Sequence, residues 1–214
     1  MKKSRARSPE KKAEKFQEIV TQGRELFLQV GSQGFSMRAL AKKLKMSPGN
    51  LYNYVQSKRE LWFATIKEDF KVFTEGMVKI VDSFSGSQID LLIKIANYYF
   101  DFATEDFDRY KMMFMTPAPP ADTIGPIEAS YQPKSFEIMV DIVKTAMAQD
   151  EIIEMDPMLF TLFIWGIVHG NVELRVPVAF FPKHFITQMG ELSKQKEFIL
   201  AQLQKMMANY KKKK

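Results

Sequence analysis

The sequence predicts an all-α protein in which a head of three short helices precedes a longer helical body, with about nine helices in total. Apolar residues recur at three- and four-residue spacing along most of the chain, as they do on the buried face of an amphipathic helix. No segment alternates apolar and polar residues over the length of a strand. Serine followed by proline, a pair that favours a helix start, occurs twice in the first 50 residues.

The head is expected to begin with a helix over residues 9–30, with Ser8 as its N-cap. The run Gly31–Gly34 should break this helix, since glycine is a poor helix former. Ser36 can then cap a short second helix, and Ser47 can cap a third. Because few residues separate the second and third helices, they must be joined by a tight turn.

A long fourth helix is expected from Lys58 to about Phe84, because Ser57 and Glu60 have the spacing of a capping box. The segment Thr116–Pro126 cannot be helical throughout, since its prolines lack the amide donor that a helix needs. The remaining helices are expected at about residues 91–102, 110–115, 133–147, 157–176 and 183–208.

The composition excludes several kinds of site. The 214 residues contain no cysteine and two histidines, so disulfide frameworks, zinc–thiolate sites and cysteine nucleophiles are ruled out. The carboxylates show neither an ExxH pairing nor the spacing of metal ligands. We therefore expect no catalytic residue, no metal and no cofactor, and a protein that is not an enzyme.

The chain is expected to be cytoplasmic. Its N-terminus is charged and lacks the apolar core of a secretory signal. The longest uncharged stretch of the apolar C-terminal half, Met158–Val172, has 15 residues, whereas a bilayer span needs roughly 20. No membrane partner is expected.

Positive charge is concentrated near the N-terminus. Residues 1–60 hold 14 Lys and Arg against 5 Asp and Glu, whereas residues 61–214 hold 17 against 20. A basic head on a mildly acidic body indicates a partner that carries phosphate. The run Lys211–Lys214 is expected to be a solvated tail, with non-specific phosphate contact as the alternative.

The second and third helices of the head have the proportions of a helix-turn-helix. Leu51 and Val55 are expected to pack inward on the first helix. Gly49 would let the backbone approach a groove, and Asn50 and Asn53 can bond to phosphates or to adenine edges. This pattern predicts that the third helix reads double-stranded DNA.

These residues resemble the TetR, or tetracycline-repressor-like, family of transcriptional regulators. The matching segments are Leu26-Phe27 with Gly31, Ser36-Met37-Arg38-Ala39-Leu40-Ala41, and Gly49-Asn50-Leu51-Tyr52-Asn53-Tyr54-Val55 with Lys58 and Leu61. The spacing is matched without a gap over about 50 residues. Ser32 and Val55 depart from the family pattern, which has an aromatic residue and Phe there. We expect Phe35 to fill the first gap and the head to stay intact.

The resemblance implies a homodimeric regulator, usually a repressor, that binds a palindromic operator and is released by a small apolar or aromatic ligand. It places DNA contacts on Ser36, Arg38, Ser47, Pro48, Gly49, Asn50, Tyr52, Asn53, Tyr54 and Lys58. Ser36 and Ser47 could instead only cap helices, Tyr52 could be half buried in the core, and Lys58 could be merely solvated.

The body is unusually rich in Phe and Met, with 18 and 14 residues in the chain. This composition suits either a loosely packed core or a pocket for an apolar ligand. The candidate ligand-binding residues are Phe73, Met77, Tyr98, Phe102, Met113, Phe136, Met139, Trp165 and His169. Core packing is the alternative for each of them, and His169 is expected to be a hydrogen-bonded core histidine.

Two apolar helices near the C-terminus are expected to pair with their copies in a four-helix dimer interface. The segment Trp165–Gly170 resembles a Trp-x-x-x-His-Gly segment of the TetR family, and its two glycines would let another helix approach closely. The candidate interface residues are Leu159, Leu162, Phe163, Gly166, Gly170, Leu192, Ile199, Leu203 and Met206. The alternative is that these faces only close the core of the protomer.

These expectations divide the chain into a DNA-binding head at residues 1–57, a ligand-sensing and dimerisation body at 58–210, and a basic tail at 211–214. A function of a different class stays open, namely a helical carrier of lipids or small molecules without specific DNA binding. The proline-rich segment 116–126 could be the mouth of a pocket or a plain connector.

Overall fold

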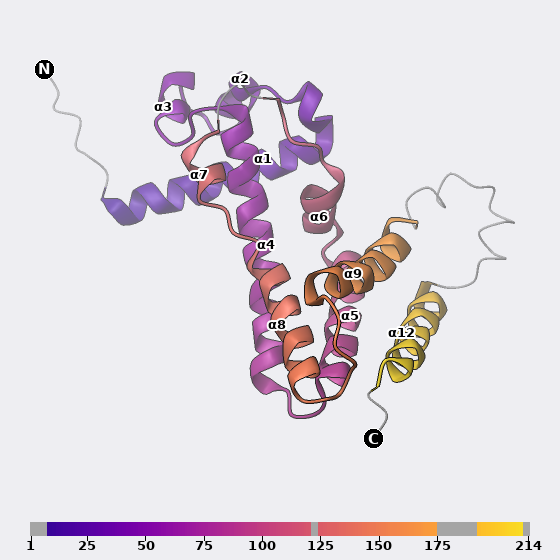
Figure 1. The fold of residues 1–214 in the computed structure, drawn as a ribbon. Coiled ribbons are helices and arrows are strands. Elements are labelled where there is room, and N and C mark those ends of the chain that lie inside the picture. Colours follow the sequence, from indigo (N-terminus) through magenta and orange to yellow (C-terminus); the bar gives the residue numbers. More distant parts are fainter. Residues whose placement is uncertain (1–7, 121–123, 175–191, 212–214) are drawn as a thin grey trace, which may run out of the picture. The chain divides into compact units, whose positions relative to one another are not determined.

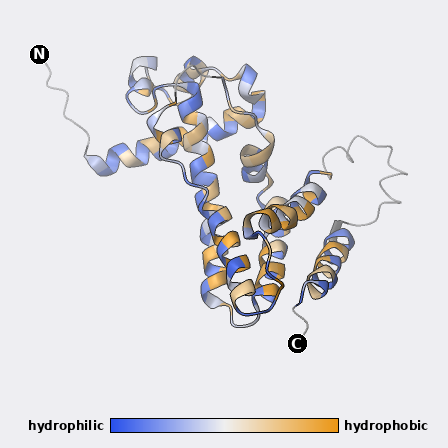
Figure 2. Cartoon of the chain, viewed as in Figure 1, coloured by the Kyte–Doolittle hydropathy of each residue, from blue (hydrophilic) through white to orange (hydrophobic). Residues whose placement is uncertain are grey.

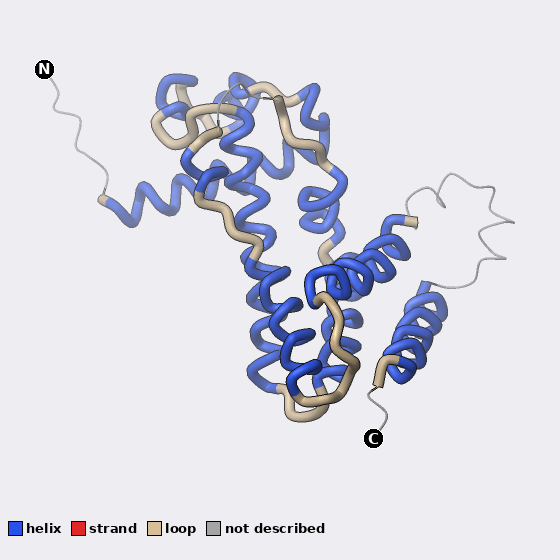
Figure 3. The backbone as a smooth tube through the Cα atoms, in the orientation of Figure 1, coloured by secondary structure: helices blue, strands red, loops and turns tan. Residues whose placement is uncertain are grey.

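The computed structural model describes residues 8–120, 124–174 and 192–211 (Figure 1). Within these ranges every regular element is a helix, which confirms the all-α prediction (Figure 3). The elements are α1 Pro9–Gly34, α2 Met37–Lys43, α3 Pro48–Tyr52, α4 Lys58–Ser83, α5 Gln88–Glu105, α6 Phe107–Tyr110, the π-helical turn η1 Lys111–Met115, α7 Pro126–Ala129, α8 Lys134–Ala148, α9 Pro157–Glu173 and α12 Leu192–Asn209.

Serine side chains begin the helices of the head where the sequence predicts them. The Ser8 hydroxyl accepts a hydrogen bond from the Lys11 amide at 3.4 Å. The Ser57 hydroxyl accepts from the Glu60 amide at 3.0 Å, and the Glu60 carboxylate accepts from the Gln56 amide at 2.5 Å. The start of α4 is therefore a close variant of the capping box, with the returning bond one residue earlier.

Helix α1 is kinked where its end is predicted. Gly31 has φ 69° and ψ 172°, which interrupts the helical geometry, but helical turns resume and α1 ends at Gly34. A residue with a side chain would be strained at this positive φ, so glycine makes the kink possible. The predicted break at Gly31 is confirmed, although the chain regains helical form after it.

The segment between α5 and α8 differs most from prediction. A single helix is expected over residues 110–115, but the structure has α6 followed directly by the π-helical turn η1. The residues that follow, Thr116–Pro120, are irregular as their prolines predict. A short helix that the sequence analysis does not predict, α7, begins at Pro126, a residue suited to the first helical position.

The chain divides into two compact units, and unit 1 contains residues up to Val72 together with Asp108–Gln132. Its core joins α1, α2 and α3 to the first half of α4, and Met112 of η1 is fully buried in the same cluster. The boundary expected at residue 57 falls inside this unit, because Leu61 and Ile66 of α4 complete the core of the head.

Unit 2 contains Phe73–Phe107 and the residues from Pro133 onward. Helix α5 is central to it and packs against α8, α9 and α12, while α8 also packs against α9. Figure 2 shows apolar residues concentrated along α5 and α9. Residues 183–191 of the last predicted helix and Lys212–Lys214 of the predicted tail lie outside the described residues.

Candidate functional site

The head presents two short helices joined by a tight turn. These are α2, Met37–Lys43, and α3, Pro48–Tyr52. The Met46 amide donates to the Ala41 carbonyl at 2.9 Å, and Lys45 adopts the left-handed conformation with φ 52°. These features close the end of α2 and redirect the chain into α3. The predicted tight turn is confirmed.

Helix α3 is held by an apolar inner face. Leu51 and Val55 are both 0% exposed and lie in the core of unit 1 with Leu40 and Leu61, as predicted. Of the predicted DNA-contacting residues, the exposed ones are Ser36, Arg38, Ser47, Pro48, Gly49, Tyr52 and Asn53, and the half-buried ones are Asn50, Tyr54 and Lys58. A helix can read a DNA groove when its buried side is held in place and its polar side chains are accessible.

The two serines of the helix-turn-helix act as N-caps. The Ser36 hydroxyl accepts from the Ala39 amide at 3.4 Å, and the Ser47 hydroxyl accepts from the Asn50 amide at 3.2 Å. Each hydroxyl keeps its own proton, so capping leaves it able to donate to a phosphate. The Lys58 ammonium donates to the carbonyl just before Ser36 at 3.5 Å, so this side chain is not merely solvated.

The core of the head accommodates both departures from the family pattern. Phe35 is 5% exposed and stacks on Phe27 with ring centroids 3.9 Å apart. Phe35 therefore fills the first gap as predicted. Ser32 is buried and donates its hydroxyl proton to the Pro117 carbonyl. Val55, in place of the usual Phe, is fully buried.

A buried carboxylate that the sequence analysis does not identify joins three helices of unit 1. Asp69 of α4 is 0% exposed and accepts hydrogen bonds from Arg24 of α1 at 3.1 Å and from Arg109 of α6 at 2.8 Å. A second guanidinium nitrogen of Arg24 lies 2.5 Å from the same carboxylate. Burial raises the pKa of Asp69 to about 6, and the two guanidinium charges oppose that rise. Asp69 thus links α4 to α1 and to α6.

A bidentate ion pair joins α4 to α7 in the same unit. Two guanidinium nitrogens of Arg59 donate to the two carboxylate oxygens of Glu128 at 2.8 and 2.6 Å. A third nitrogen donates to the Pro119 carbonyl at 2.9 Å, and the guanidinium lies 5.2 Å from the Phe63 ring centroid. The hydrogen bond with Arg59 lowers the pKa of Glu128 and raises that of Arg59 itself. No local sequence pattern predicts this pair either.

Several predicted ligand-binding residues form an aromatic cluster in unit 2. The Phe73 ring stacks on Tyr98 with centroids 5.3 Å apart and meets Phe102 edge-on at 5.0 Å. The Tyr98 hydroxyl donates to the Phe73 carbonyl at 3.1 Å. Burial raises the pKa of Tyr98 to about 12, with a smaller contribution from Asp106, so its hydroxyl remains neutral. Met77 is fully buried.

His169 supplies a polar group among the aromatic residues of α5, α8 and α9. Its Nδ1 lies 2.7 Å from the Tyr99 hydroxyl oxygen, the hydrogen bond expected of a core histidine. Trp165 lies beside it, with ring centroids 5.3 Å apart, and Phe136 meets Trp165 at 6.4 Å. Burial lowers the pKa of His169, opposed by the charge of Glu173, so the imidazole is neutral at pH 7.

The other two methionines of the predicted ligand site are not equivalent. Met139 is half-buried on α8 in unit 2. Met113 is buried in η1, which belongs to unit 1, so the structure does not group it with the aromatic cluster. The spacing of apolar residues around Met113 does not indicate that Met113 belongs to unit 1. That membership depends on contacts between segments that are distant in the sequence.

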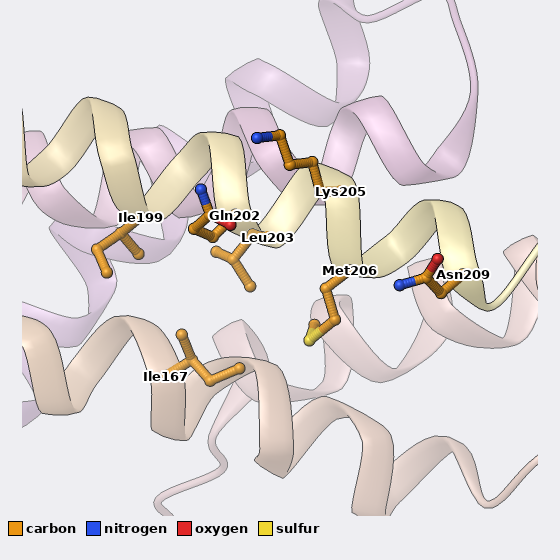
Figure 4. A pocket seen from close by; sticks show the side chains of 7 residues that line it. All are labelled: Ile167, Ile199, Gln202, Leu203, Lys205, Met206 and Asn209. Atoms are coloured by element: carbon orange, nitrogen blue, oxygen red, sulfur yellow. The ribbon is translucent and has the colours of Figure 1, made fainter.

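A pocket of about 350 Å³ lies between α9 and α12 (Figure 4). It is lined by Ile167 of α9 and by Ile199, Gln202, Leu203, Lys205, Met206 and Asn209 of α12. None of the nine predicted ligand-binding residues lines it, whereas three of the predicted interface residues do. The hollow therefore belongs to the surface expected to face a second protomer.

The α9 part of the predicted dimer interface is open. Leu159, Leu162 and Phe163 are 65%, 42% and 47% exposed. Apart from the backbone of its own helix, a Cβ atom added at Gly166 or Gly170 would meet no atom of the described residues within 4 Å. Exposed apolar side chains beside two unfilled glycines leave room for a closely packed partner helix.

The α12 part of that interface differs from expectation at one residue. Leu203 is 2% exposed, because this side of α12 packs on α5 and closes the core of unit 2. Ile199 and Met206 are half-buried and remain partly available. The side chain of Leu192 lies outside the described residues.

Candidate metal sites and membrane spans are both absent from the described part of the chain. No group of three or more His, Asp or Glu residues there could hold a metal ion. No helix in the same ranges combines the length and the apolar character that crossing a bilayer requires.

Solved structures with the same fold include regulators captured with ligands and with DNA. FadR from Bacillus subtilis in complex with stearoyl-CoA has a TM-score of 0.68 and 17% identity, covering 88% of this chain and 97% of that one. AibR in complex with isovaleryl coenzyme A and operator DNA has a TM-score of 0.62 and 19% identity, covering 89% and 96%. A TetR/AcrR family regulator from Thermobifida fusca YX-ER1 has a TM-score of 0.60 and 17% identity, covering 94% and 100%.

Two family models match the sequence itself, and no curated protein does. The model of the bacterial regulatory proteins of the tetR family matches residues 19–65, which contain the helix-turn-helix. The model of the tetracyclin repressor-like C-terminal domain matches residues 92–192. Since these matches cover most of both the head and the body, the chain belongs to the TetR family of bacterial regulatory proteins.

Proposed function

We propose that this protein is a cytoplasmic, ligand-responsive transcriptional repressor that binds a palindromic operator as a homodimer and catalyses no reaction. The observation that carries this proposal is α3, whose Leu51 is buried in the core of the head while Ser47, Asn50 and Asn53 remain at least partly accessible. Two copies related by a two-fold axis would place their α3 helices about one DNA turn apart, roughly 34 to 36 Å. The operator should therefore have the same two-fold symmetry.

In the head, charged and neutral side chains would make different contacts with DNA. Helix α3 itself contains no Lys or Arg. Exposed cations lie around it instead, including Arg38, Lys42 and Lys45. These charges would hold the phosphate backbone, while Asn50 and Asn53 would read base edges by hydrogen bonds.

The aromatic cluster of unit 2 supports an apolar effector. FadR and AibR are each known in complex with an acyl-CoA. An acyl chain suits the apolar rings around Phe73 and Phe102, and the Tyr99–His169 pair offers one polar anchor nearby in the same unit. Binding there would release the protein from DNA.

Selection from a random DNA library with the purified protein tests this function. We expect a two-fold symmetric sequence to emerge, and we expect stearoyl-CoA or isovaleryl-CoA to lower the affinity for it. Binding that is unsymmetrical and insensitive to sequence would refute the operator. A co-purified lipid together with no DNA affinity at low salt would favour the alternative function, a carrier of lipids or small molecules.

The two kinds of DNA contact should respond differently to truncation. Asn50→Ala should weaken operator binding by about tenfold and relax the preference for one base, because it removes a base-edge contact worth roughly 1–3 kcal/mol. Lys58→Ala should weaken binding to all sequences and lower the salt slope by about one. Fluorescence anisotropy on operator and random duplexes at several salt concentrations separates the two.

The control for charge is Lys134→Ala, at an exposed position of α8, which should leave both the affinity and the salt slope unchanged. An equal loss on operator and random DNA for Asn50→Ala would show that this residue only positions the head.

The glycines of α9 give a test of the dimer. Gly166→Leu should leave the protomer folded, because the space before Gly166 is unfilled in the described chain and glycine is a poor residue inside a helix. The added side chain should block a partner helix, so sedimentation velocity should show monomers and operator affinity should fall at least about tenfold. Gly166→Ala should have a smaller effect. A variant that remains fully dimeric would place the interface on another surface.

A further inference from the structure

The chain between α5 and α8 forms a strap, here defined as residues 108–120 and 124–132. Helices α5 and α8 both belong to unit 2, but the strap belongs to unit 1. The chain thus passes from α5 of unit 2 into the strap, which is part of unit 1 with the DNA-binding head, and then into α8 of unit 2. Its contacts within unit 1 make it more than a plain connector.

The first half of the strap is built into the core of the head. Met112 is 0% exposed within the apolar cluster that also buries Leu51 and Val55 of the recognition helix region. Ala118 packs against the same cluster. The Ser32 hydroxyl, just after the kink of α1, donates to the Pro117 carbonyl. The strap therefore fixes the end of α1 as well as the core under α3.

The second half of the strap holds the first turn of α4. Arg59 donates to both carboxylate oxygens of Glu128 and to the Pro119 carbonyl, so one side chain is hydrogen-bonded to the strap at two residues. The Arg59–Glu128 pair is only partly exposed, at 25% and 14% of the two side chains. Arg59 directly follows Lys58, the predicted phosphate contact. Fixing Arg59 therefore also fixes the backbone that carries Lys58.

We propose that Glu128 is a positioning residue for DNA recognition, which acts through Arg59 to hold the first turn of α4 in the conformation that binds the operator. This inference rests on the proposed function as a DNA-binding regulator. Both ends of the strap continue directly into helices of the sensor unit, so a shift of α5 or α8 acts on the Arg59–Glu128 latch through the chain itself. Because coupling is reciprocal, DNA binding should also stabilise the latch.

The sign of one substitution separates positioning from simple electrostatics. Glu128→Gln removes a negative charge from the head, which by charge alone would raise affinity for DNA. Loss of the latch predicts the opposite, an operator affinity about fivefold lower or more, with an unchanged salt slope because no phosphate contact is removed. Glu128→Asp, which keeps the carboxylate, should fall between the wild type and Glu128→Gln. Glu137→Gln, at an exposed position of α8, is the matched control and should bind like the wild type.

Hydrogen exchange of the full chain tests the latch, first without DNA or effector and then with DNA. In Glu128→Gln, amides in the first turn of α4 and in residues 124–130 should exchange about fivefold faster or more, while those of α9 stay unchanged. In the wild type, adding the duplex selected from a random library should slow exchange in residues 124–130.

Two outcomes would overturn the proposal. Unchanged exchange in the first turn of α4 of Glu128→Gln would show that there is no latch, whether or not a DNA preference is found. Faster exchange with unchanged or higher operator affinity would show that the latch does not position the DNA contacts. Failure to select any preferred DNA sequence would instead refute the proposed function, and the exchange measurement would still report on the latch separately.

Discussion

Gly76→Ala should lower the free energy of unfolding by about 2–3 kcal/mol, an effect typical of overpacking in a core. A Cβ atom at this position of α4 would lie 2.0 Å from the Tyr98 hydroxyl oxygen and 2.4 Å from Cζ of the same ring. The ring cannot move aside freely, because it stacks on Phe73 and donates a hydrogen bond to the Phe73 carbonyl. Urea unfolding followed by circular dichroism measures the loss.

A double-mutant cycle isolates the cause of that loss. In a Tyr98→Ala background the clash is gone, so adding Gly76→Ala should cost little or even stabilise α4 through higher helix propensity. Equal stability of Gly76→Ala and the wild type would mean that α4 and α5 do not approach as closely as the structure shows.

Asp69→Ala should destabilise the protein by about 3 kcal/mol or more, because it leaves two guanidinium groups without their shared carboxylate. The side chains of Arg24 and Arg109 are only 13% and 24% exposed, so water replaces the lost bonds poorly. Thermal unfolding with matched controls measures this. Asp141→Ala, which removes a 72% exposed partner of Lys144, should change stability by less than about 0.5 kcal/mol. Similar effects of the two substitutions would contradict a structural role for Asp69.

The pKa of Asp69 adds a pH signature to that prediction. The pKa is about 6 in the folded protein against an ordinary value of 3.8, so the folded chain binds more protons than the unfolded chain between these values. The contribution of Asp69 to stability should therefore fall as the pH rises from about 4 to about 6 and then level off, by about 1–3 kcal/mol in total. Asp69→Asn should lose this component of the pH profile. An unchanged profile in Asp69→Asn would assign the effect to other groups.

Local sequence patterns were sufficient to predict the helix-turn-helix. Ser47 and Pro48 start α3, and Leu51 and Val55 recur at the spacing that buries one helix face. The capping of α4 by Ser57 is likewise decided within a few residues. Elements whose determinants lie within one or two turns can be read from the chain directly.

The ion pairs of Asp69 and of Arg59 with Glu128 could not be predicted in this way. Asp69 pairs with residues 45 and 40 positions away, and Arg59 pairs with Glu128, 69 positions away. Charged residues are common on helices, and only the tertiary arrangement decides which of them meet. The same reason applies to Leu203, since periodicity identifies an apolar face of α12 but not whether α5 or a partner covers it.

The central claim, that two α3 helices read a symmetric operator, is tested most directly by hydroxyl-radical footprinting on the duplex selected from random DNA. We expect two protected regions related by a two-fold axis, with centres separated by about 10 base pairs or by a multiple of one turn. Both regions should weaken together in Asn50→Ala. A single unsymmetrical protected region, or protection spread evenly along any duplex, would contradict the account.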